Sequence, residues 1–325
     1  MNEPNRREFL GLATVGGLTL AGCRISGEKV KNTTKKEIIE TYRFNIGNIE
    51  CIIVIDGYMS LPASALFCNA PEESLEQVLR EYNLDSDKIK GSISSMVVRT
   101  KEHLVLVGTA YGPGGRLIQN LQKEGIEPED IDTIILPHGH WDHVGWNTDN
   151  EGNLVFPNAR YVMWKDELDF WTSEKYLKQL DEIHVNSARN NILPIKNKID
   201  VIAQETEILP GINAILAAGH TPGQMVLEIS SEEEKLLYLT CVVQSPIHIE
   251  YPEWYGGNNG VGFDRKLDNN GLVEKGFFSL PSRNKFLSKA VAEKALVFAP
   301  HFYPIIPGYV IQKGERWKFQ PISNK

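Results

Sequence analysis

Three histidines and one aspartate within six residues restrict this 325-residue chain more than any other feature. The cluster reads His138-Gly139-His140-Trp141-Asp142-His143. It follows the short apolar run Ile131–Leu136, which is typical of a buried strand. Imidazole nitrogens and carboxylate oxygens are natural zinc ligands. The sequence therefore predicts a metal site in the loop that leaves a buried strand.

The spacing within this cluster divides its donors into two sets. In an extended loop, His138 and His140 point the same way and can bind one ion. Asp142 and His143 follow after the chain has bent, where they can face a second ion. Only 8 of the 325 residues are histidine, so chance gives such a pattern in roughly one of several thousand sequences of this length.

The cluster resembles the signature of the metallo-β-lactamase-like superfamily, in which His-x-His-x-Asp-His is followed by single ligands far along the chain. Gly219–Gly223 (Gly-His-Thr-Pro-Gly) resembles the loop that carries the third histidine, and Phe298–Phe302 (Phe-Ala-Pro-His-Phe) resembles the loop that carries the last one. Phe156–Tyr161 and Asp142–Asn147 are similar to a subgroup of lactonases and methyl-parathion-hydrolase-like enzymes. The resemblance extends over roughly residues 42–321.

This resemblance implies a fold of the α/β (α+β) class: an αββα sandwich of two mixed β-sheets flanked by helices, with the site at one edge of the sheets. Strands and helices mix throughout the sequence, which independently favours sheets covered by helices in one domain. The implied ligand sets are His138, His140 and His220 for one metal, and Asp142, His143 and His301 for the other.

The implied activity is hydrolysis of an ester-like bond in a small molecule: a lactone, a carboxylic ester or a phosphotriester. The cofactor that the resemblance implies is Zn²⁺, as one or two ions, with iron and manganese left open. The resemblance implies metal-activated hydroxide as the nucleophile and a catalytic role for Asp142 in orienting it. Hydrolysis of β-lactams is an alternative within the same chemistry. The resemblance is also consistent with a homodimer.

The sequence departs from the family at Cys241, because family members usually have a bridging aspartate there. Three interpretations remain open. Cys241 is a thiolate ligand or bridge to zinc, or it is a small buried apolar residue beside a single ion, or the site has lost activity.

Smaller departures are Gly108, where the family often has an aspartate that acts as an outer-shell partner, and Pro137 and Gln224. Together with Cys241, Gly108 motivates a second hypothesis: a lipoprotein that binds a ligand on a degenerate metallohydrolase scaffold. A third hypothesis is a redox or sulfur-handling enzyme with one iron. His103, His184 and His248 have no motif around them and are interpreted as surface or satisfied core residues.

The amino-terminal residues resemble an export signal. Arg6 and Arg7 precede the apolar run Phe9–Ala21, which is shorter than the about 20 residues that a membrane span needs. This pattern is similar to a twin-arginine signal. Leu20–Cys23 (Leu-Ala-Gly-Cys) is similar to a lipoprotein signal-peptidase box. The resemblance implies cleavage before Cys23 and attachment of lipid to its sulfur, which anchors the protein to a membrane.

We therefore expect three parts: an export signal peptide over residues 1–22, a lipid-anchored polar tether over 23–40 and a metallo-β-lactamase-like domain over 41–325. The expected location is outside the cytoplasm, anchored to a bacterial membrane in the periplasm or at the cell surface. A net charge of −8 and the absence of a long basic stripe argue against a nucleic-acid partner. A disulfide between Cys51 and Cys68 stays open.

The pattern of apolar and turn residues predicts the following elements. Helices are expected over 71–84 and 117–124, around Leu168, Phe170 and Trp171, and over 173–193 and 285–294. Strands are expected from Tyr42 through the alternating residues 49–55, then over 94–99 with 103–107, on both sides of 156–159, and over 211–217, 225–229, 236–243 and 295–299, with a closing hairpin over 308–321. Turns or loops are expected at Asp56-Gly57 and over 252–272.

Overall fold

The computed structural model describes residues 40–256, 264–267, 273–276 and 279–322. The chain divides into two units, Met1–Ile38 and Ile39–Lys325. The expected export signal, with Arg6, Arg7 and Cys23, lies outside the described residues. Among the helices that the structure describes, none has the length and apolar character needed to cross a membrane.

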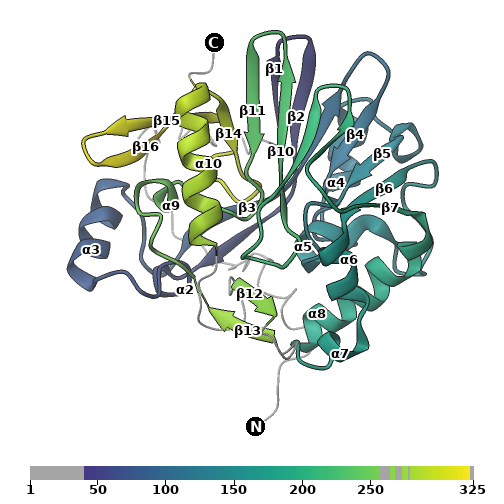
Figure 1. The fold of residues 1–325 in the computed structure, drawn as a ribbon, viewed down its shortest axis with the longest axis horizontal. Helices are drawn as coiled ribbons and strands as arrows, with labels where there is room; N and C mark the ends of the chain where they lie inside the picture. Colours follow the sequence, from purple (N-terminus) through teal and green to yellow (C-terminus); the bar gives the residue numbers. More distant parts are fainter. Residues whose placement is uncertain (1–39, 257–263, 268–272, 277–278, 323–325) are drawn as a thin grey trace, which may run out of the picture. The chain divides into compact units, whose positions relative to one another are not determined.

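The first sheet has seven strands that follow one another in chain order (Figure 1). They are β1 (Thr41–Ile46), β2 (Ile49–Leu61), β3 (Ile89–Arg99), β4 (Leu104–Val107), β5 (Thr133–Ile135), β6 (Arg160–Trp164) and β7 (Ile199–Ile202). Strands β1 to β4 pair antiparallel, whereas β4 to β7 pair parallel. Parallel neighbours need crossover connections, and the helices between these strands supply them.

The second sheet also has seven strands, in the order β16-β15-β14-β11-β10-β9-β8. They are β8 (Thr206–Leu209), β9 (Ile212–Leu216), β10 (Met225–Ser231), β11 (Glu234–Tyr238), β14 (Leu296–Phe298), β15 (Gly308–Lys313) and β16 (Arg316–Pro321). Its one parallel pair is β11 with β14, so both of these strands end at the same end of the sheet.

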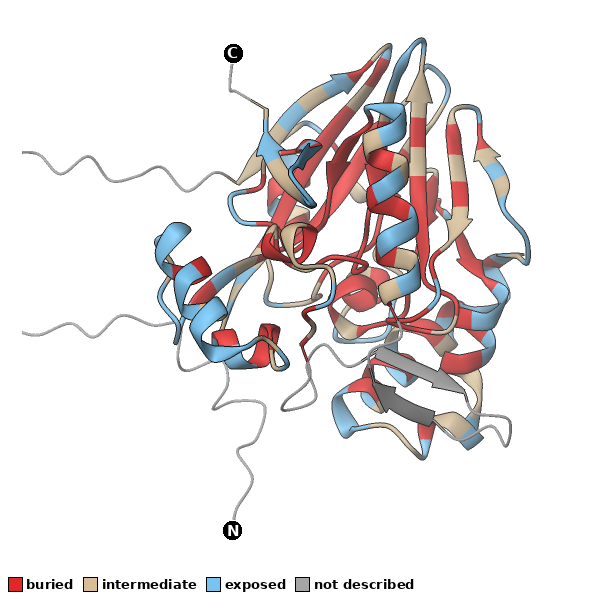
Figure 2. Ribbon diagram, turned by 60° about the vertical axis from the view of Figure 1, so that its left-hand side comes forward, coloured by how far each residue is buried: buried red, intermediate tan, exposed pale blue. Residues whose placement is uncertain are grey.

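The helices are mostly short. They are α2 (Ala63–Leu66), α3 (Glu72–Glu81), α4 (Leu117–Lys123), α5 (Trp141–Val144), α6 (Lys165–Thr172), α7 (Glu174–Leu177), α8 (Glu182–Ser187), α9 (Ile247–Glu250) and α10 (Leu280–Glu293). Short 3₁₀ or π segments cover Pro128–Asp130, Gly145–Asn147, Ala188–Ile192 and Leu193–Lys198. Helix α10 buries one side and exposes the other (Figure 2).

The main core lies between the two sheets. It contains Ile53 and Met96 from the first sheet and Leu227 and Val297 from the second. On β2, the alternating residues 49, 51, 53 and 55 belong to this inner core, whereas Ile52 and Val54 belong to a second core under the helices α4 and α6. This is the period of two that a strand with both faces covered requires. The αββα sandwich expected from the sequence is confirmed.

Three expected elements are wrong. Asp56-Gly57 is not a turn, because β2 continues through it with a β-bulge between Ile55 and Gly57. Only β6 forms next to residues 156–159, since Leu154 makes an isolated bridge with Thr148. The expected helix 173–193 breaks into α7, α8 and the π segment, because Asp181 takes an extended backbone (φ −69°, ψ 153°).

The other differences concern boundaries. Helix α10 begins at Leu280 rather than at 285, since Pro281 fits the first turn of a helix. The expected strand over 236–243 ends at Tyr238 as β11. The expected loop over 252–272 contains the strand β12 (Asp264–Leu267), which pairs with β13 (Val273–Gly276). The sequence of these two strands shows no alternation of apolar residues, so it gave no sign of the hairpin.

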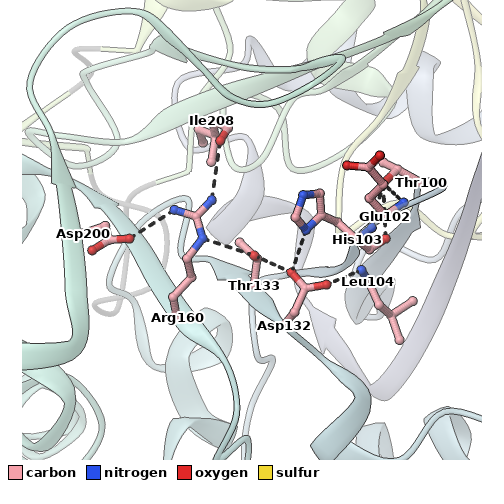
Figure 3. Close-up of polar contacts among 9 residues, drawn as sticks. All are labelled: Thr100, Glu102, His103, Leu104, Asp132, Thr133, Arg160, Asp200 and Ile208. Carbon is pink, nitrogen blue, oxygen red and sulfur yellow. Dashed lines mark hydrogen bonds and ion pairs between the residues drawn. The ribbon is translucent and has the colours of Figure 1, made fainter.

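A polar network joins the amino ends of β4, β5 and β6 (Figure 3). The carboxylate of Asp132 accepts the backbone N–H of Leu104 at 2.6 Å, and its other oxygen lies 3.3 Å from His103 Nδ1. Arg160 donates to Thr133 Oγ1 at 3.3 Å. Since the histidine cluster follows the opposite, carboxyl end of β5, His103 belongs to the support of the sheet.

The sandwich core predicts a difference between two isoleucines in strands. Ile53→Ala removes a fully buried side chain and should lower the free energy of unfolding by about 2–5 kcal/mol. Ile311→Ala, at an exposed position on β15, should change it by at most about 0.5 kcal/mol. Urea denaturation of both variants is the measurement. Equal losses would contradict the assigned core.

Candidate metal centre

The loops that carry the candidate ligands leave the carboxyl ends of strands from both sheets. His138 follows β5, Cys241 follows β11 and His301 follows β14, while His220 lies in the connection between β9 and β10. Strands buried on both faces fix the points from which these loops start. The short helix α5 then turns the chain so that Asp142 and His143 face the same place.

Seven buried donor side chains come together there. They are His138, His140, Asp142, His143, His220, Cys241 and His301. They form three groups, and within each group the donor atoms lie within 4.8 Å of one another. The groups are His138 with His140 and His220, Asp142 with His143 and His301, and His138 with His143 and Cys241. The first two groups are the two ligand sets that the resemblance implied.

Cys241 lies against the histidines of the second group. Its Sγ is 3.3 Å from Nε2 of His143 and 3.3 Å from Nε2 of His301. The same two nitrogens lie 3.7 and 3.5 Å from Oδ2 of Asp142. The preceding Thr240 has a left-handed backbone (φ +51°), and its hydroxyl donates to the carbonyl of Met225 at 2.8 Å. That turn at the end of β11 directs the thiol into the cluster.

The histidine at the centre of the cluster lacks a hydrogen-bond partner. Both ring nitrogens of His138 are buried and have no partner among the described residues. A buried nitrogen without a partner costs free energy, and such an atom in a native structure calls for a missing partner. The surrounding imidazoles, carboxylate and thiol form the donor set that zinc prefers. The residues therefore fit a metal ion.

The protonation states also suit a cation. Burial, together with the neighbouring imidazoles, holds the pKa of His138 well below its ordinary value. Burial lowers the pKa of His143 to about 3. Burial alone would raise the pKa of Asp142, but His143 and His301 lower it below the ordinary value. Neutral imidazoles and an ionised carboxylate are the forms that bind metal.

One contact that fixes a candidate ligand has no signature in the sequence. The backbone carbonyl of Ser92 lies 2.9 Å from Nδ1 of His301, which leaves Nε2 of that ring for the cluster. Metal-binding histidines commonly use their second nitrogen in this way. A backbone acceptor 209 residues away leaves no pattern in the sequence.

A second missed residue, Glu167 in α6, is buried and accepts backbone N–H groups from Gly139 and Gly223. A single acidic residue in a short helix is usually exposed to solvent, so the sequence did not predict that Glu167 is buried.

The departures from the family pattern have distinct positions. Gly108 has φ +69°, and a Cβ built there would lie 3.8 Å from Nδ1 of His143. Gln224 is buried and donates to the carbonyl of Ala217 at 3.3 Å. Trp141 is half-buried with its ring edge-on to Tyr111.

The remaining histidines and cysteines that the structure describes lie outside the three donor groups. His184 contacts the ring of His140 at a centroid distance of 5.2 Å, which makes it a neighbour of the cluster. His248 lies beside Phe67 in a separate core cluster. Cys51 and Cys68 are free thiols in the structure.

Comparison with known proteins gives a family match and relatives. The family model described as the metallo-beta-lactamase superfamily matches residues 89–288. An N-acyl homoserine lactonase from a Bacillus species is 33% identical over 189 residues, which is 57% of this chain and 62% of that relative. The chain thus matches less than two thirds of the length of this curated relative.

Two solved structures are similar over most of the chain. AidC, a dizinc quorum-quenching lactonase in complex with a product, has 29% sequence identity and a TM-score of 0.75, covering 88% of this chain and 98% of that one. The hydrolase AbOPH has 23% identity and a TM-score of 0.75, covering 89% and 100%, and it supports the fold alone. Since the family model matches more than half of the residues and the fold is the αββα sandwich, the chain belongs to the metallo-beta-lactamase superfamily.

Proposed function

We propose that this protein is a zinc-dependent hydrolase that opens lactones or related ester bonds in small molecules. The observation that carries the proposal is the set of seven buried donors, in which His138 has two nitrogens without a partner. The lactonase relative and the dizinc lactonase structure suggest the class of substrate.

The donor residues have separate tasks in this proposal. Zinc bound by this set supplies a Lewis acid and a source of hydroxide near neutral pH. His138, His140 and His220 would hold one ion, and Asp142, His143 and His301 would hold the other. The carboxylate of Asp142, whose pKa lies below its ordinary value, would also accept a hydrogen bond from the attacking water and orient it. Because the site is buried, these charges act at low effective dielectric.

Cys241 completes the second set as a thiolate in our proposal. Its sulfur is equally far from Nε2 of His143 and of His301, and it shares a donor group with His138 and His143. It therefore occupies a position that reaches both ligand sets. A thiolate keeps the single negative charge of the aspartate that the family usually has there.

A metal analysis tests this role. The wild-type protein should contain about two zinc ions per chain, and Cys241→Ala should contain about one. Elemental analysis of purified protein is the measurement. Cys68→Ala, which changes a thiol outside the donor groups, is the matched control and should match the wild type. A zinc content of one or none that Cys241→Ala leaves unchanged would mean that Cys241 only packs.

Activity measurements test the reaction. Zinc-loaded protein should release acid from an N-acyl homoserine lactone, followed in a pH-stat beside a carboxylic ester and a phosphotriester. His140→Ala should lower the rate at least about 100-fold, since loss of a direct ligand exceeds the 10–100-fold typical of outer-shell changes. His103→Ala, in the remote polar network, should leave the rate unchanged. Zinc-loaded protein that cleaves no substrate of the panel would refute the hydrolase.

If the zinc-loaded protein cleaves no substrate, a ligand-binding protein on a degenerate metallohydrolase scaffold becomes the leading candidate. Gly108 and Cys241, the departures from the family pattern, motivate this alternative. Gly108→Asp combined with Cys241→Asp then separates the two functions. A large gain from near zero favours the degenerate scaffold, whereas loss of an existing activity favours Cys241 as a working ligand.

We also propose that the protein is exported and lipid-anchored, on the strength of Arg6, Arg7 and the box that ends in Cys23. In a bacterial host, replacing Arg6 and Arg7 together by lysine should leave the precursor in the cytoplasm. Cys23→Ala should yield a protein without lipid. Mass spectrometry of the protein recovered from the membrane fraction is the measurement. Arg43→Lys, in β1, is the control. Membrane recovery of the Cys23→Ala protein with the wild-type mass would contradict the anchor.

A further inference from the structure

Glu167 is a buried carboxylate that stands outside the seven donors. Its two oxygens accept three N–H groups: from the backbone of Gly139 at 2.8 Å, from the indole of Trp171 at 2.6 Å and from the backbone of Gly223 at 2.9 Å. Within the described residues, no lysine or arginine forms a salt bridge with it. A buried charge is costly unless it is well hydrogen-bonded, so the carboxylate calls for a reason beyond the stability of α6.

The two backbone donors belong to the two loops that carry the first ligand set. Gly139 lies between His138 and His140, and Gly223 follows His220 by three residues. Oε1 accepts the backbone N–H of Gly139 in the first loop, and Oε2 accepts the backbone N–H of Gly223 in the second. One carboxylate therefore fixes the separation of two loops that lie far apart in the sequence.

The fit of α6 against these loops is close. A Cβ at Gly139 would lie 2.4 Å from the ring of Trp171, and a Cβ at Gly223 would lie 2.3 Å from the backbone nitrogen of Glu167. Neither position has room for a larger residue without movement of the helix or the loop. The hydrogen bonds of Glu167 thus act across contacts that leave the loops little freedom to shift.

Trp171 extends this arrangement to a ligand side chain. It lies one helical turn after Glu167, and its ring meets the ring of His140 edge-on at a centroid distance of 5.5 Å. The same indole is also stacked on His184 at 6.0 Å and meets Phe170 edge-on at 5.1 Å. By accepting the indole N–H, Glu167 orients the ring of Trp171, which packs against the ring of His140.

We propose that Glu167 is a positioning residue for the metal site: it sets the geometry of His138, His140 and His220 by joining their two loops. It acts through the loops and through Trp171, and it binds no metal itself. The inference rests on the proposed metal site. It adds that the affinity of the first ligand set, and not of the second, depends on a carboxylate in α6.

The test is the zinc affinity of each ion in Glu167→Gln, measured on metal-depleted full-length protein by competition with a chromophoric chelator. Glutamine has one acceptor oxygen and presents an amide N–H to a donor, so at least one of the three N–H groups loses its partner. We expect one of the two zinc ions to bind about 10–100-fold more weakly, and the other to keep its wild-type affinity. Glu167→Asp, which keeps the charge, should recover part of the loss.

A matched control and a milder variant complete the experiment. Glu228→Gln in β10 removes a largely buried carboxylate that pairs with Lys289 at 2.8 Å, and it should leave both affinities unchanged. Trp171→Phe keeps an aromatic ring and removes the indole N–H, so it should weaken the same ion by a smaller factor. If Glu167→Gln fails to fold, Trp171→Phe decides the matter by itself.

The outcomes separate this inference from the proposed function. A wild-type protein that binds no zinc overturns the metal site and the role of Glu167 with it. A wild-type protein that binds two zinc ions, with Glu167→Gln unchanged or with both ions equally weakened, overturns the positioning role alone.

Discussion

Much of this structure depends on one costly arrangement: five imidazoles, a carboxylate and a thiol buried at the same end of two sheets. Polar groups removed from water need partners, and His138 finds none among the described residues. A bound cation would provide that partner, and the surrounding side chains would coordinate it. The sandwich makes the arrangement possible, because strands that are buried on both faces hold the starting points of the loops.

The sequence predicted the parts of this arrangement that local patterns encode. The motif from His138 to His143 is written in consecutive residues, and the alternation along β2 separates the inner core from the outer one in the way a strand requires. The loops around His220 and His301 were found by resemblance, since a single histidine has no pattern of its own. That these two loops lie beside Asp142 and His143 follows from the fold and not from the local sequence.

The contacts that support the site could not be predicted, because they join residues without local signatures. Glu167 accepts a hydrogen bond from Gly223, which is 56 residues away in the sequence. The carbonyl of Ser92 contacts the ring of His301, which is 209 residues away. Asp56 looked like the start of a turn beside Gly57, yet its carboxylate accepts the backbone N–H groups of Tyr111 and Leu117 and the indole N–H of Trp146. An acidic residue that binds backbone groups of a distant loop has the same local sequence as one in a turn.

The distribution of negative charge links the departures from the family to the supporting contacts. Gly108 leaves no carboxylate beside Nδ1 of His143, and its left-handed backbone disfavours a larger residue there. A thiolate at Cys241 would keep one negative charge where an aspartate usually lies, and sulfur is the softer donor for zinc. Glu167 places a further buried carboxylate behind the opposite ligand set. A two-metal centre needs anionic charge to offset its cations. In this chain that charge would come from Asp142 and Cys241 in the cluster and from Glu167 behind it, so the first ligand set would depend on a residue that never touches the metal.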